Sequence, residues 1–257
     1  MIGHPEKYAM VTGASSGIGY ELSKLLAKDG KNLILVSRNR DKLEQVKTEI
    51  ENRYGNQVRV LPCDLARPRG PQEIFIELEK ENLSVDVLVN NAGFGIYGMF
   101  AETELQAELE MIQLNIVSST YLTKLLVKKM LEDKSGWILN VSSTLGCLPV
   151  PLLLVYAATK AYLLHFSEGL ACELQGSGVN VTCLCPQPTR TLFWSNMEHA
   201  KSSKMNMLDA ATVAGIGYKA LKKGKTVANA GILANSLPFL LRIAPRNSLI
   251  KMMKSSA

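Results

Sequence analysis

Stretches with the patterns of strands and of helices alternate along the first 185 residues of this chain of 257 residues. The strand-like stretches, such as residues 32–37 and 85–90, carry apolar residues at consecutive positions rather than only at every second one. Strands that are apolar on both faces belong to parallel sheets covered by helices on both sides. The alternation therefore predicts an α/β fold, and the right-handed crossover rule makes it a doubly wound parallel sheet with helices on both faces.

The predicted strands cover residues 8–12, 32–37, 57–62, 85–90, 136–142 and 180–185. The predicted helices reach from the turn after Thr12 to about residue 29 and cover residues 41–54, 71–82, 156–175 and 209–223, with one or two more over residues 103–132. Residues 189–207 are polar and irregular, and residues 228–253 are expected to form short helices and turns. No internal repeat, low-complexity segment or linker interrupts the pattern, so residues 1–257 are expected to be a single domain.

Basic residues are concentrated in the C-terminal tail. The net charge is +6, and eight Lys or Arg but no acidic residue follow Asp209. Such a tail can be solvated, or it can meet an anionic substrate, a membrane surface or nucleic acid. Apolar residues lie among the bases between Leu240 and Lys254, which fits a lid packed on the domain and also a peripheral membrane contact. We favour the lid and expect no nucleic-acid partner.

The cysteines and histidines show no spacing typical of a metal site. The five cysteines include no C-x-x-C pair, and the three histidines are scattered. Cys183 and Cys185 lie two residues apart in a predicted strand, so their side chains should point the same way and be packed. The N-terminus has no apolar signal-peptide core, and no apolar run approaches the roughly 20 residues that span a bilayer. We therefore expect a cytoplasmic protein with reduced thiols.

A glycine-rich turn directly follows the first predicted strand. It runs from Thr12 to Gly19 as Thr-Gly-Ala-Ser-Ser-Gly-Ile-Gly and opens a helix. Glycines permit a tight turn there and let backbone amides approach a pyrophosphate at the helix N-terminus. A glycine-rich segment alone is weak evidence, but its place between a strand and a helix at the start of a βαβ unit favours a Rossmann-like dinucleotide site. A purely structural turn is the alternative.

The second predicted strand ends in Ser37 and Arg38 rather than in an acidic residue. NAD-selective sites usually place an acid here to hold the ribose 2′-hydroxyl, whereas an Arg accommodates a 2′-phosphate and can stack on adenine. We therefore expect NADP(H), with Arg38 as the main determinant and Ser37 as a neutral partner. Asp64 follows the third strand, near the expected adenine, and Asn90-Asn-Ala-Gly93 ends the fourth, at the edge where ligands bind.

Tyr156 and Lys160 lie four residues apart in a predicted helix, on one face and one turn apart. An ammonium near a phenol stabilises the phenolate, so we expect the pKa of Tyr156 to fall from its usual value of about 10. Tyr156 could then donate and accept a proton, and the hydroxyl of Ser143 could hold a carbonyl oxygen. Taken alone, a Tyr and a Lys at this spacing also occur by chance in many helices.

These motifs resemble, in order and spacing, those of the short-chain dehydrogenase/reductase family in its classical, single-domain form. The resemblance covers roughly residues 7–191, and its elements are the Thr12–Gly19 turn, Asp64, Asn90-Asn-Ala-Gly93, Asn115, Ser143, Tyr156 with Lys160, and Pro186 with Thr191. It implies a catalytic tetrad. Tyr156 would transfer the proton, and Lys160 would lower its pKa and bind the nicotinamide ribose. Ser143, selected over Ser142 by the family spacing, would orient the substrate oxygen, and Asn115 would link Lys160 to a proton relay through a water.

The resemblance also implies the residues that contact NADP(H). They are Gly13, Ser15, Ser16, Gly17, Ile18, Gly19, Ser37, Arg38, Asp64, Leu65, Asn91, Ala92, Gly93, Tyr156, Lys160, Pro186, Thr189 and Thr191. Residues 1–188 would form the dinucleotide-binding core with the catalytic residues, and residues 189–257 a substrate loop and a basic lid. One departure is Gln187, where the family commonly has Gly after Pro. We expect it to alter the geometry of the cofactor loop without abolishing activity.

The resemblance leaves the substrate open. The expected lining is Phe94, Gly95, Tyr97, Leu145, Gly146, Cys147, Val150, Phe193 and Trp194, with part of the tail. Such an apolar surface suits a 3-oxoacyl chain, a steroid-like molecule or a lipid ketone or aldehyde, with reduction as the expected direction. The family also implies a homodimer or homotetramer formed through the long helices from Thr103 and from Tyr156. The alternative is a nucleotide-binding regulator or scaffold of the same fold without turnover, although such proteins generally lack the Tyr or the Lys.

Overall fold

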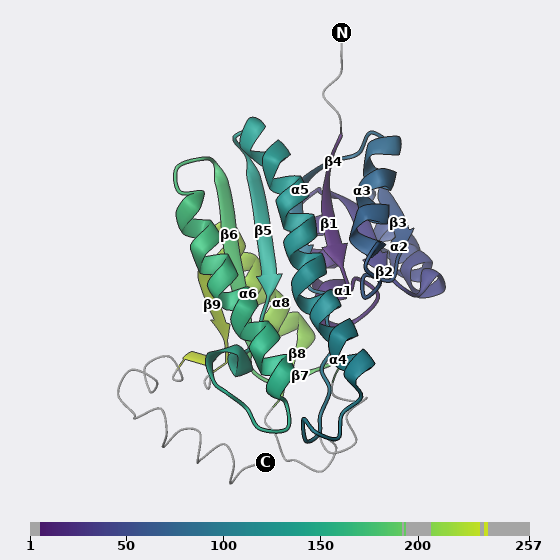
Figure 1. Ribbon diagram of the computed structural model, residues 1–257. Helices are drawn as coiled ribbons and strands as arrows, with labels where there is room; N and C mark the ends of the chain where they lie inside the picture. The colour runs from purple at the N-terminus through teal and green to yellow at the C-terminus, as the bar shows by residue number, and fades with distance from the viewer. Residues whose placement is uncertain (1–5, 192, 194–206, 232–233, 236–257) are drawn as a thin grey trace.

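The computed structural model describes residues 6–191, 193, 207–231 and 234–235 and has a seven-stranded parallel sheet at its centre (Figure 1). The strand order is β3-β2-β1-β4-β5-β6-β9, and each pair of neighbours is parallel. The strands are β1 (Lys7–Thr12), β2 (Asn32–Ser37), β3 (Val58–Pro62), β4 (Ser84–Asn90), β5 (Gly136–Val141), β6 (Val179–Pro186) and β9 (Val227–Ala230). The order reverses between β1 and β4, as in a doubly wound fold, so the predicted fold class is confirmed.

Helices cover both faces of the sheet (Figure 1). They are α1 (Gly17–Lys28), α2 (Arg40–Tyr54), α3 (Gly70–Lys80), α4 (Leu105–Ile112), α5 (Ser119–Glu132), α6 (Leu154–Glu173) and α8 (Ala210–Lys222). One apolar cluster joins α1, α2 and α8 to the sheet, and a second joins α3, α5 and α6 to the opposite face. Alternate residues of β1 are divided between the clusters, because Ala9 and Val11 belong to the first and Tyr8 and Met10 to the second.

A chain of buried polar side chains crosses the second apolar layer. The amide of Asn90 in β4 donates to Thr123 of α5 at 2.9 Å and to Asn140 of β5 at 2.8 Å. Asn140 in turn donates to Ser167 of α6 at 2.9 Å. Buried polar groups of this kind need such partners, since leaving one unpaired costs roughly 1–3 kcal/mol. The chain therefore fixes how α5 and α6 sit on the sheet.

The structure adds strands that the sequence pattern did not reveal. The prediction of short helices and turns over residues 228–253 is wrong at its start, because residues 227–230 form β9, which pairs with β6 as the last strand of the sheet. Residues 189–190 form β7 (Thr189–Arg190), which pairs with β8 (Leu208–Asp209). The prediction of irregular structure over residues 189–207 is therefore wrong at its start, while residues 192 and 194–206 lie outside the described residues. The predicted helix over residues 209–223 is confirmed as α8.

The long helical stretch predicted over residues 103–132 is interrupted in its middle. Residues Gln113–Ser118 form a π-helical segment (η1) between α4 and α5. A π-helical turn holds one residue more than an α-helical turn, and such turns are frequent at functional sites. Because of this segment, Asn115 is completely buried and faces the start of α6 rather than continuing the face of α4.

The carboxyl ends of the parallel strands meet at one edge of the sheet, drawn at the bottom of Figure 1. The turn after β1, the segment after β4, the short 3-10 helix η2 (Thr144–Cys147) after β5 and the segment after β6 all leave the sheet there. Ligands of doubly wound proteins bind at this edge, beside the point where the strand order reverses.

Candidate active site

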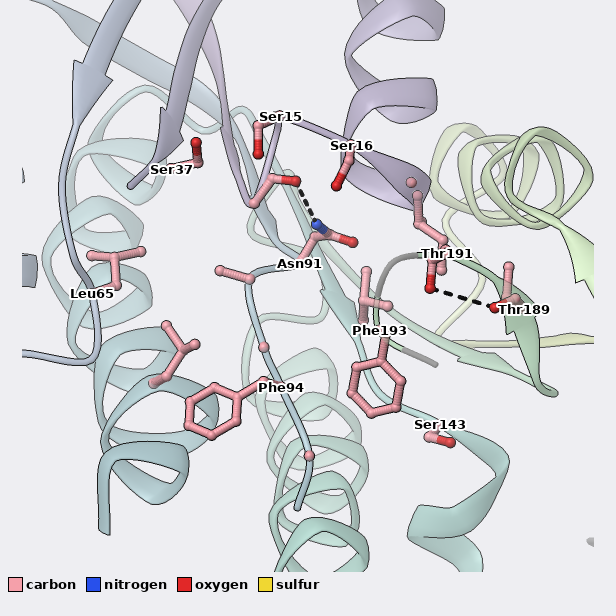
Figure 2. A pocket seen from close by; sticks show the side chains of 18 of the residues that line it. Ser15, Ser16, Ser37, Leu65, Asn91, Phe94, Ser143, Thr189, Thr191 and Phe193 are labelled. Carbon is pink, nitrogen blue, oxygen red and sulfur yellow. Dashed lines mark hydrogen bonds between the residues drawn. The ribbon is translucent and has the colours of Figure 1, made fainter. Parts of the chain in front are cut away.

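A cleft of about 760 Å³ lies at the carboxyl ends of the strands. Its walls come from the turn after β1, the end of β2, the segments after β3, β4 and β6, and the start of α6. Figure 2 looks into this cleft, with Ser37 and Leu65 on one side, Thr189 and Thr191 on the other, and Asn91 between them. Gly13 and Thr191, which are 178 residues apart in the sequence, therefore line the same cavity. Of the residues predicted to bind the cofactor, all but Gly19 line it.

The glycine-rich turn is held against the segment after β4. Gly13 has a φ of 66°, in the left-handed region that favours glycine. The Asn91 amide donates to the carbonyl oxygen of Thr12 at 2.9 Å and to that of Gly13 at 3.3 Å. A Cβ on Gly19 would overlap the Gly13 carbonyl and lie 2.5 Å from Asn91 Nδ2, so Gly19 shapes the turn from behind. The tight turn at the N-terminus of α1 fits a pyrophosphate group.

The far end of the cleft, beside β2, carries more polar groups than the sequence suggested. Arg38 lines it, as predicted, together with Asn39 and Lys42, and Glu110 of α4 lines another part of the same cleft wall. The Asn39 side chain accepts from the Lys42 backbone N–H at 2.9 Å and so caps α2. Lys42 could have been found, because it follows Arg38 by four residues in the first turn of α2. Glu110 could not, since it belongs to a helix far along the chain.

Tyr156 and Lys160 lie in the first turns of α6, and Ser143 caps η2 beside them. Lys160 Nζ donates to the carbonyl oxygen of Val141 at 2.9 Å and lies 5.7 Å from the centre of the Tyr156 ring. Ser143 Oγ accepts from the backbone N–H of Leu145 at 3.1 Å, which leaves its own proton available for an acceptor in the cleft. All three side chains line the cleft, so the predicted constellation is assembled.

Burial dominates the proton affinities of the Tyr–Lys pair. It raises the pKa of Tyr156 above its usual value, and the Ser143 hydroxyl opposes this rise only in part. Burial also lowers the pKa of Lys160 to about 8, with a smaller opposing effect from Cys183 and Cys185. The expectation that Lys160 lowers the pKa of Tyr156 is therefore wrong for this arrangement of the two side chains. The cause is desolvation, combined with the direction of the ammonium towards the Val141 carbonyl.

Asn115 approaches this pair from the π-helical segment. Its side-chain N–H groups donate to the carbonyl oxygen of Phe94 at 3.1 Å and to Thr159 Oγ1 at 3.0 Å. Its oxygen accepts from the backbone N–H of Phe94 at 3.3 Å. A Cβ added to Gly93 would lie 2.9 Å from Asn115 Oδ1 and 3.4 Å from Lys160 Nζ, so both atoms face the same small space beside Gly93.

The serine next to Ser143 has a supporting role. Ser142 Oγ donates to the carbonyl oxygen of Lys160 at 2.6 Å and so ties the end of β5 to α6. Ser142, which the family spacing passes over in favour of Ser143, thus supports the end of the strand. A Cβ on Gly146 would meet the same Lys160 carbonyl group at 2.7 Å, so Gly146 allows η2 to approach α6 closely.

The apolar side of the cleft matches the predicted lining in part. Phe94, Gly95, Leu145 and Phe193 line it, and the Phe193 ring lies 5.2 Å from the Tyr156 ring. The other predicted lining residues do not line the described cleft. Val150 is buried in an apolar cluster against which Tyr97 packs, Gly146 packs on α6, and Cys147 is partly buried, whereas Trp194 and the basic tail lie outside the described residues.

The segment after β6 closes the cleft opposite Ser37. Pro186 at the end of β6 and Thr189 and Thr191 beyond it line the cleft, and Thr191 Oγ1 donates to the Thr189 carbonyl oxygen at 3.4 Å (Figure 2). A Cβ on Gly17 would lie 2.9 Å from Thr191 Cγ2, so this segment touches the glycine-rich turn. Gln187 donates its backbone N–H to Ala230 of β9 at 3.0 Å, and its side chain occupies the space beside Gly231.

In the described part of the chain, no group of three or more His, Cys, Asp or Glu side chains is arranged to hold a metal ion. None of the helices in this part is both long and apolar enough to cross a membrane. The buried Cys183 and Cys185 point the same way, as predicted, with their sulfur atoms 3.8 Å apart.

Comparisons with known proteins point to one family. A family model described as short chain dehydrogenase matches residues 7–202. A very-long-chain 3-oxoacyl-CoA reductase of Anas platyrhynchos is 38% identical over 185 residues, which are 70% of this chain and 58% of that protein. A 17-beta-hydroxysteroid dehydrogenase type 3 of Rattus norvegicus is 35% identical over 203 residues, covering 77% of this chain and 65% of that protein. The chain thus spans roughly three fifths of the length of these curated relatives.

A solved structure agrees over nearly the whole chain. It is a short-chain dehydrogenase from Sphingobium yanoikuyae in complex with NADPH, with a TM-score of 0.84 and 27% sequence identity. The match covers 96% of this chain and 95% of that one. With the family model, the relatives and the assembled motifs in agreement, the chain belongs to the short-chain dehydrogenase/reductase family.

Proposed function

We propose that the protein is an NADP(H)-dependent oxidoreductase that interconverts a carbonyl group and a secondary alcohol on an apolar substrate. The observation that carries this proposal is the single cleft in which a glycine-rich turn and Arg38 share a cavity with Ser143, Tyr156 and Lys160. The relatives named as 3-oxoacyl-CoA reductase and hydroxysteroid dehydrogenase support it, as does the neighbour in complex with NADPH.

The chain's own residues divide the chemistry between them. NADPH supplies the hydride when bound, and reduction then leaves an alkoxide that needs a proton and a hydrogen-bond donor. Tyr156 is the proton donor, Ser143 donates a hydrogen bond to the substrate oxygen, and Lys160 holds positive charge near the phenol. Asn115 lies beside Lys160 in the space next to Gly93, where a water can link the ammonium to solvent.

Arg38 and Lys42 are proposed to bind the 2′-phosphate of NADP(H). Both line the cleft beside the end of β2, and no acidic residue takes the place of Arg38 there. Replacing Arg38 with Ala is expected to raise the KM for NADPH about tenfold to a hundredfold while leaving the KM for NADH nearly unchanged, because a hydrogen bond to a charged group contributes roughly 1.5–3 kcal/mol.

Steady-state kinetics with both cofactors checks this prediction. Arg40→Ala is the matched control, since Arg40 is exposed and lies outside the cleft lining. A wild-type protein that uses NADH better than NADPH would contradict the assignment, and so would equal effects of the two substitutions.

The substrate proposed for this site is a ketone or aldehyde on an apolar body. Reduction is the proposed physiological direction of the reaction. Phe94, Leu145 and Phe193 supply apolar surface beside Tyr156. Candidates are a 3-oxoacyl chain, a steroid-like molecule and a simple lipid carbonyl compound. Turnover of NADPH with a panel of these classes tests the proposal. A wild-type protein that binds NADPH but reduces none of them would favour the nucleotide-binding regulator instead.

A homodimer or homotetramer is also proposed. Apolar side chains such as Val117 and Tyr121 are exposed along η1 and α5, which suits a contact between copies. Light scattering on purified protein tests it, and a monomer at micromolar concentration would refute it. A cytoplasmic location and a peripheral membrane contact through the basic tail remain predictions. Co-sedimentation of full-length and tail-truncated protein with liposomes tests the membrane contact.

A further inference from the structure

We propose that Thr159 is a positioning residue that fixes the orientation of the Asn115 amide and thereby keeps the charge of Lys160. The inference deepens the proposed oxidoreductase function and rests on it. Thr159 precedes Lys160 in α6 and is 1% exposed, so water does not compete for its hydroxyl group. It lies 44 residues from Asn115 along the chain, and their side chains meet inside the protein.

The hydroxyl of Thr159 has only one proton to donate. That proton goes to the carbonyl oxygen of Tyr156 at 2.8 Å, because a carbonyl oxygen can only accept. Toward Asn115, at 3.0 Å, Thr159 Oγ1 must therefore act as the acceptor. This selects the nitrogen rather than the oxygen of the Asn115 amide as the atom that faces Thr159.

The remaining contacts of Asn115 agree with this choice. The second N–H of the amide donates to the Phe94 carbonyl oxygen at 3.1 Å, and the amide oxygen accepts from the Phe94 backbone N–H at 3.3 Å. These bonds use both amide protons of Asn115, and rotation of the amide would break all three of them. Because Asn115 is completely buried, no water could replace the lost partners. The oxygen is thereby held beside Gly93, in the space that Lys160 Nζ also faces.

The orientation matters for Lys160 because its burial favours the neutral amine. A carbonyl oxygen in the space beside Gly93 favours the ammonium, either directly or through one water, whereas an amide N–H in the same place would oppose it. The Thr159 bond to Tyr156 is a local contact that many helical Thr residues make. The bond to Asn115 is not local, and it connects two of the four predicted catalytic residues through one hydroxyl group.

Thr159→Val and Thr159→Ser provide a matched pair for the test. Val keeps the shape of Thr but has no hydroxyl, and Ser keeps the hydroxyl. We expect Thr159→Val to lower kcat about tenfold, the size of effect expected from losing the buried hydrogen bond to Asn115, with little change in the KM for NADPH. Thr159→Ser should restore most of the rate.

The pH profile separates positioning from mere stability. Alcohol oxidation needs the Tyr156 phenolate, which the Lys160 ammonium stabilises. In Thr159→Val the apparent pKa of the rising limb of kcat for alcohol oxidation should therefore move up relative to wild type, and in Thr159→Ser it should not. An unchanged profile in Thr159→Val, with a rate that only follows the folded fraction, would overturn the proposal.

A double-mutant cycle separates this proposal from the proposed function. The free energies of unfolding of Asn115→Ala, Thr159→Val and the double variant are compared with that of wild type. The two single changes in free energy should not add up to the change in the double variant, because the two side chains are coupled. If wild type shows no turnover on any carbonyl compound, the oxidoreductase function fails, and the cycle still decides the contact. If wild type is active and the sites are additive, the positioning role fails alone.

Discussion

Replacing Tyr156 with Phe is expected to lower the turnover of ketones by a factor of about 10²–10⁴, the range that general acid–base catalysis supplies. Tyr156 is 6% exposed and belongs to an apolar cluster with Met111 and Leu153, so Phe keeps the apolar ring and removes only the hydroxyl group. Steady-state rates with NADPH, together with NADPH binding measured by fluorescence, check this. Binding should be retained, because the glycine-rich turn and Arg38 are untouched.

Tyr162→Phe is the matched control for this experiment. Tyr162 lies on the same helix, and its hydroxyl pairs with Thr120 Oγ1 at 2.9 Å rather than facing the cleft. Turnover should survive this substitution within a few fold. A Tyr156→Phe protein that reduces ketones at the rate of the control would show that another group delivers the proton.

Replacing Lys160 with Met should abolish most turnover yet make the protein more stable at neutral pH. Met preserves the apolar part of the buried side chain but removes the charge beside Tyr156, so the rate should fall by a factor comparable to that for Tyr156→Phe. The stability gain arises because burial lowers the pKa of Lys160 from 10.5 to about 8. This shift corresponds to a cost of roughly 3 kcal/mol for keeping the ammonium charged in the folded protein.

The pH dependence of stability gives this prediction a definite sign. Between about pH 8 and 10.5 the unfolded chain keeps a proton on Lys160 that the folded chain has released. The free energy of unfolding should therefore rise with pH through this window in wild type, and the rise should be weaker in Lys160→Met. Below about pH 8, Lys160→Met should raise the free energy of unfolding by roughly 1–3 kcal/mol. The gain is smaller than the full cost of the buried ammonium, because the hydrogen bond to Val141 is lost as well.

Denaturant unfolding at several pH values between about 7 and 10 measures this effect. Above about pH 10 the raised pKa of Tyr156 acts with the opposite sign, since the unfolded chain loses a proton that the folded chain retains. Lys124→Met is the control, because Lys124 is exposed on α5. Equal slopes in wild type and Lys160→Met would mean that the ammonium is solvated in the folded state.

The strands of the sheet centre were predictable because burial on both faces leaves a strong apolar signal. Residues 32–37 form β2 with the predicted ends, β1 and β4 begin one residue earlier than predicted, and β6 is one residue longer at each end. β9 gave no such signal. Its sequence is Val-Ala-Asn-Ala, with only alternate residues buried, and its pairing with β6 arises from the packing of α8 rather than from local pattern.

The site was predictable where a motif is local and not where it depends on packing. Tyr156 and Lys160 follow from helical spacing, and the turn at Gly13 follows from its place between a strand and a helix. Asn115 came only from family resemblance, because no sequence pattern marks the π-helical segment that turns it inward. Nothing near Thr159 in the sequence marks it as part of the site, because its hydrogen-bond partner Asn115 lies 44 residues away. Spacing indicates a charge near Tyr156 but not the loss of water around its phenol, so it predicts the wrong direction for the pKa of Tyr156.

The contact between Gln187 and Gly231 restricts how relatives of this chain can diverge. The side chain of Gln187 fills the place that any Cβ at position 231 would need, and Gly231 also has a φ of 117°. A larger residue at 231 would therefore require the Gln187 side chain to move and would also strain the backbone at this φ. A Gln187→Gly change would remove the first obstacle and leave the second, so position 231 is restricted to Gly more strongly than position 187 is to Gln.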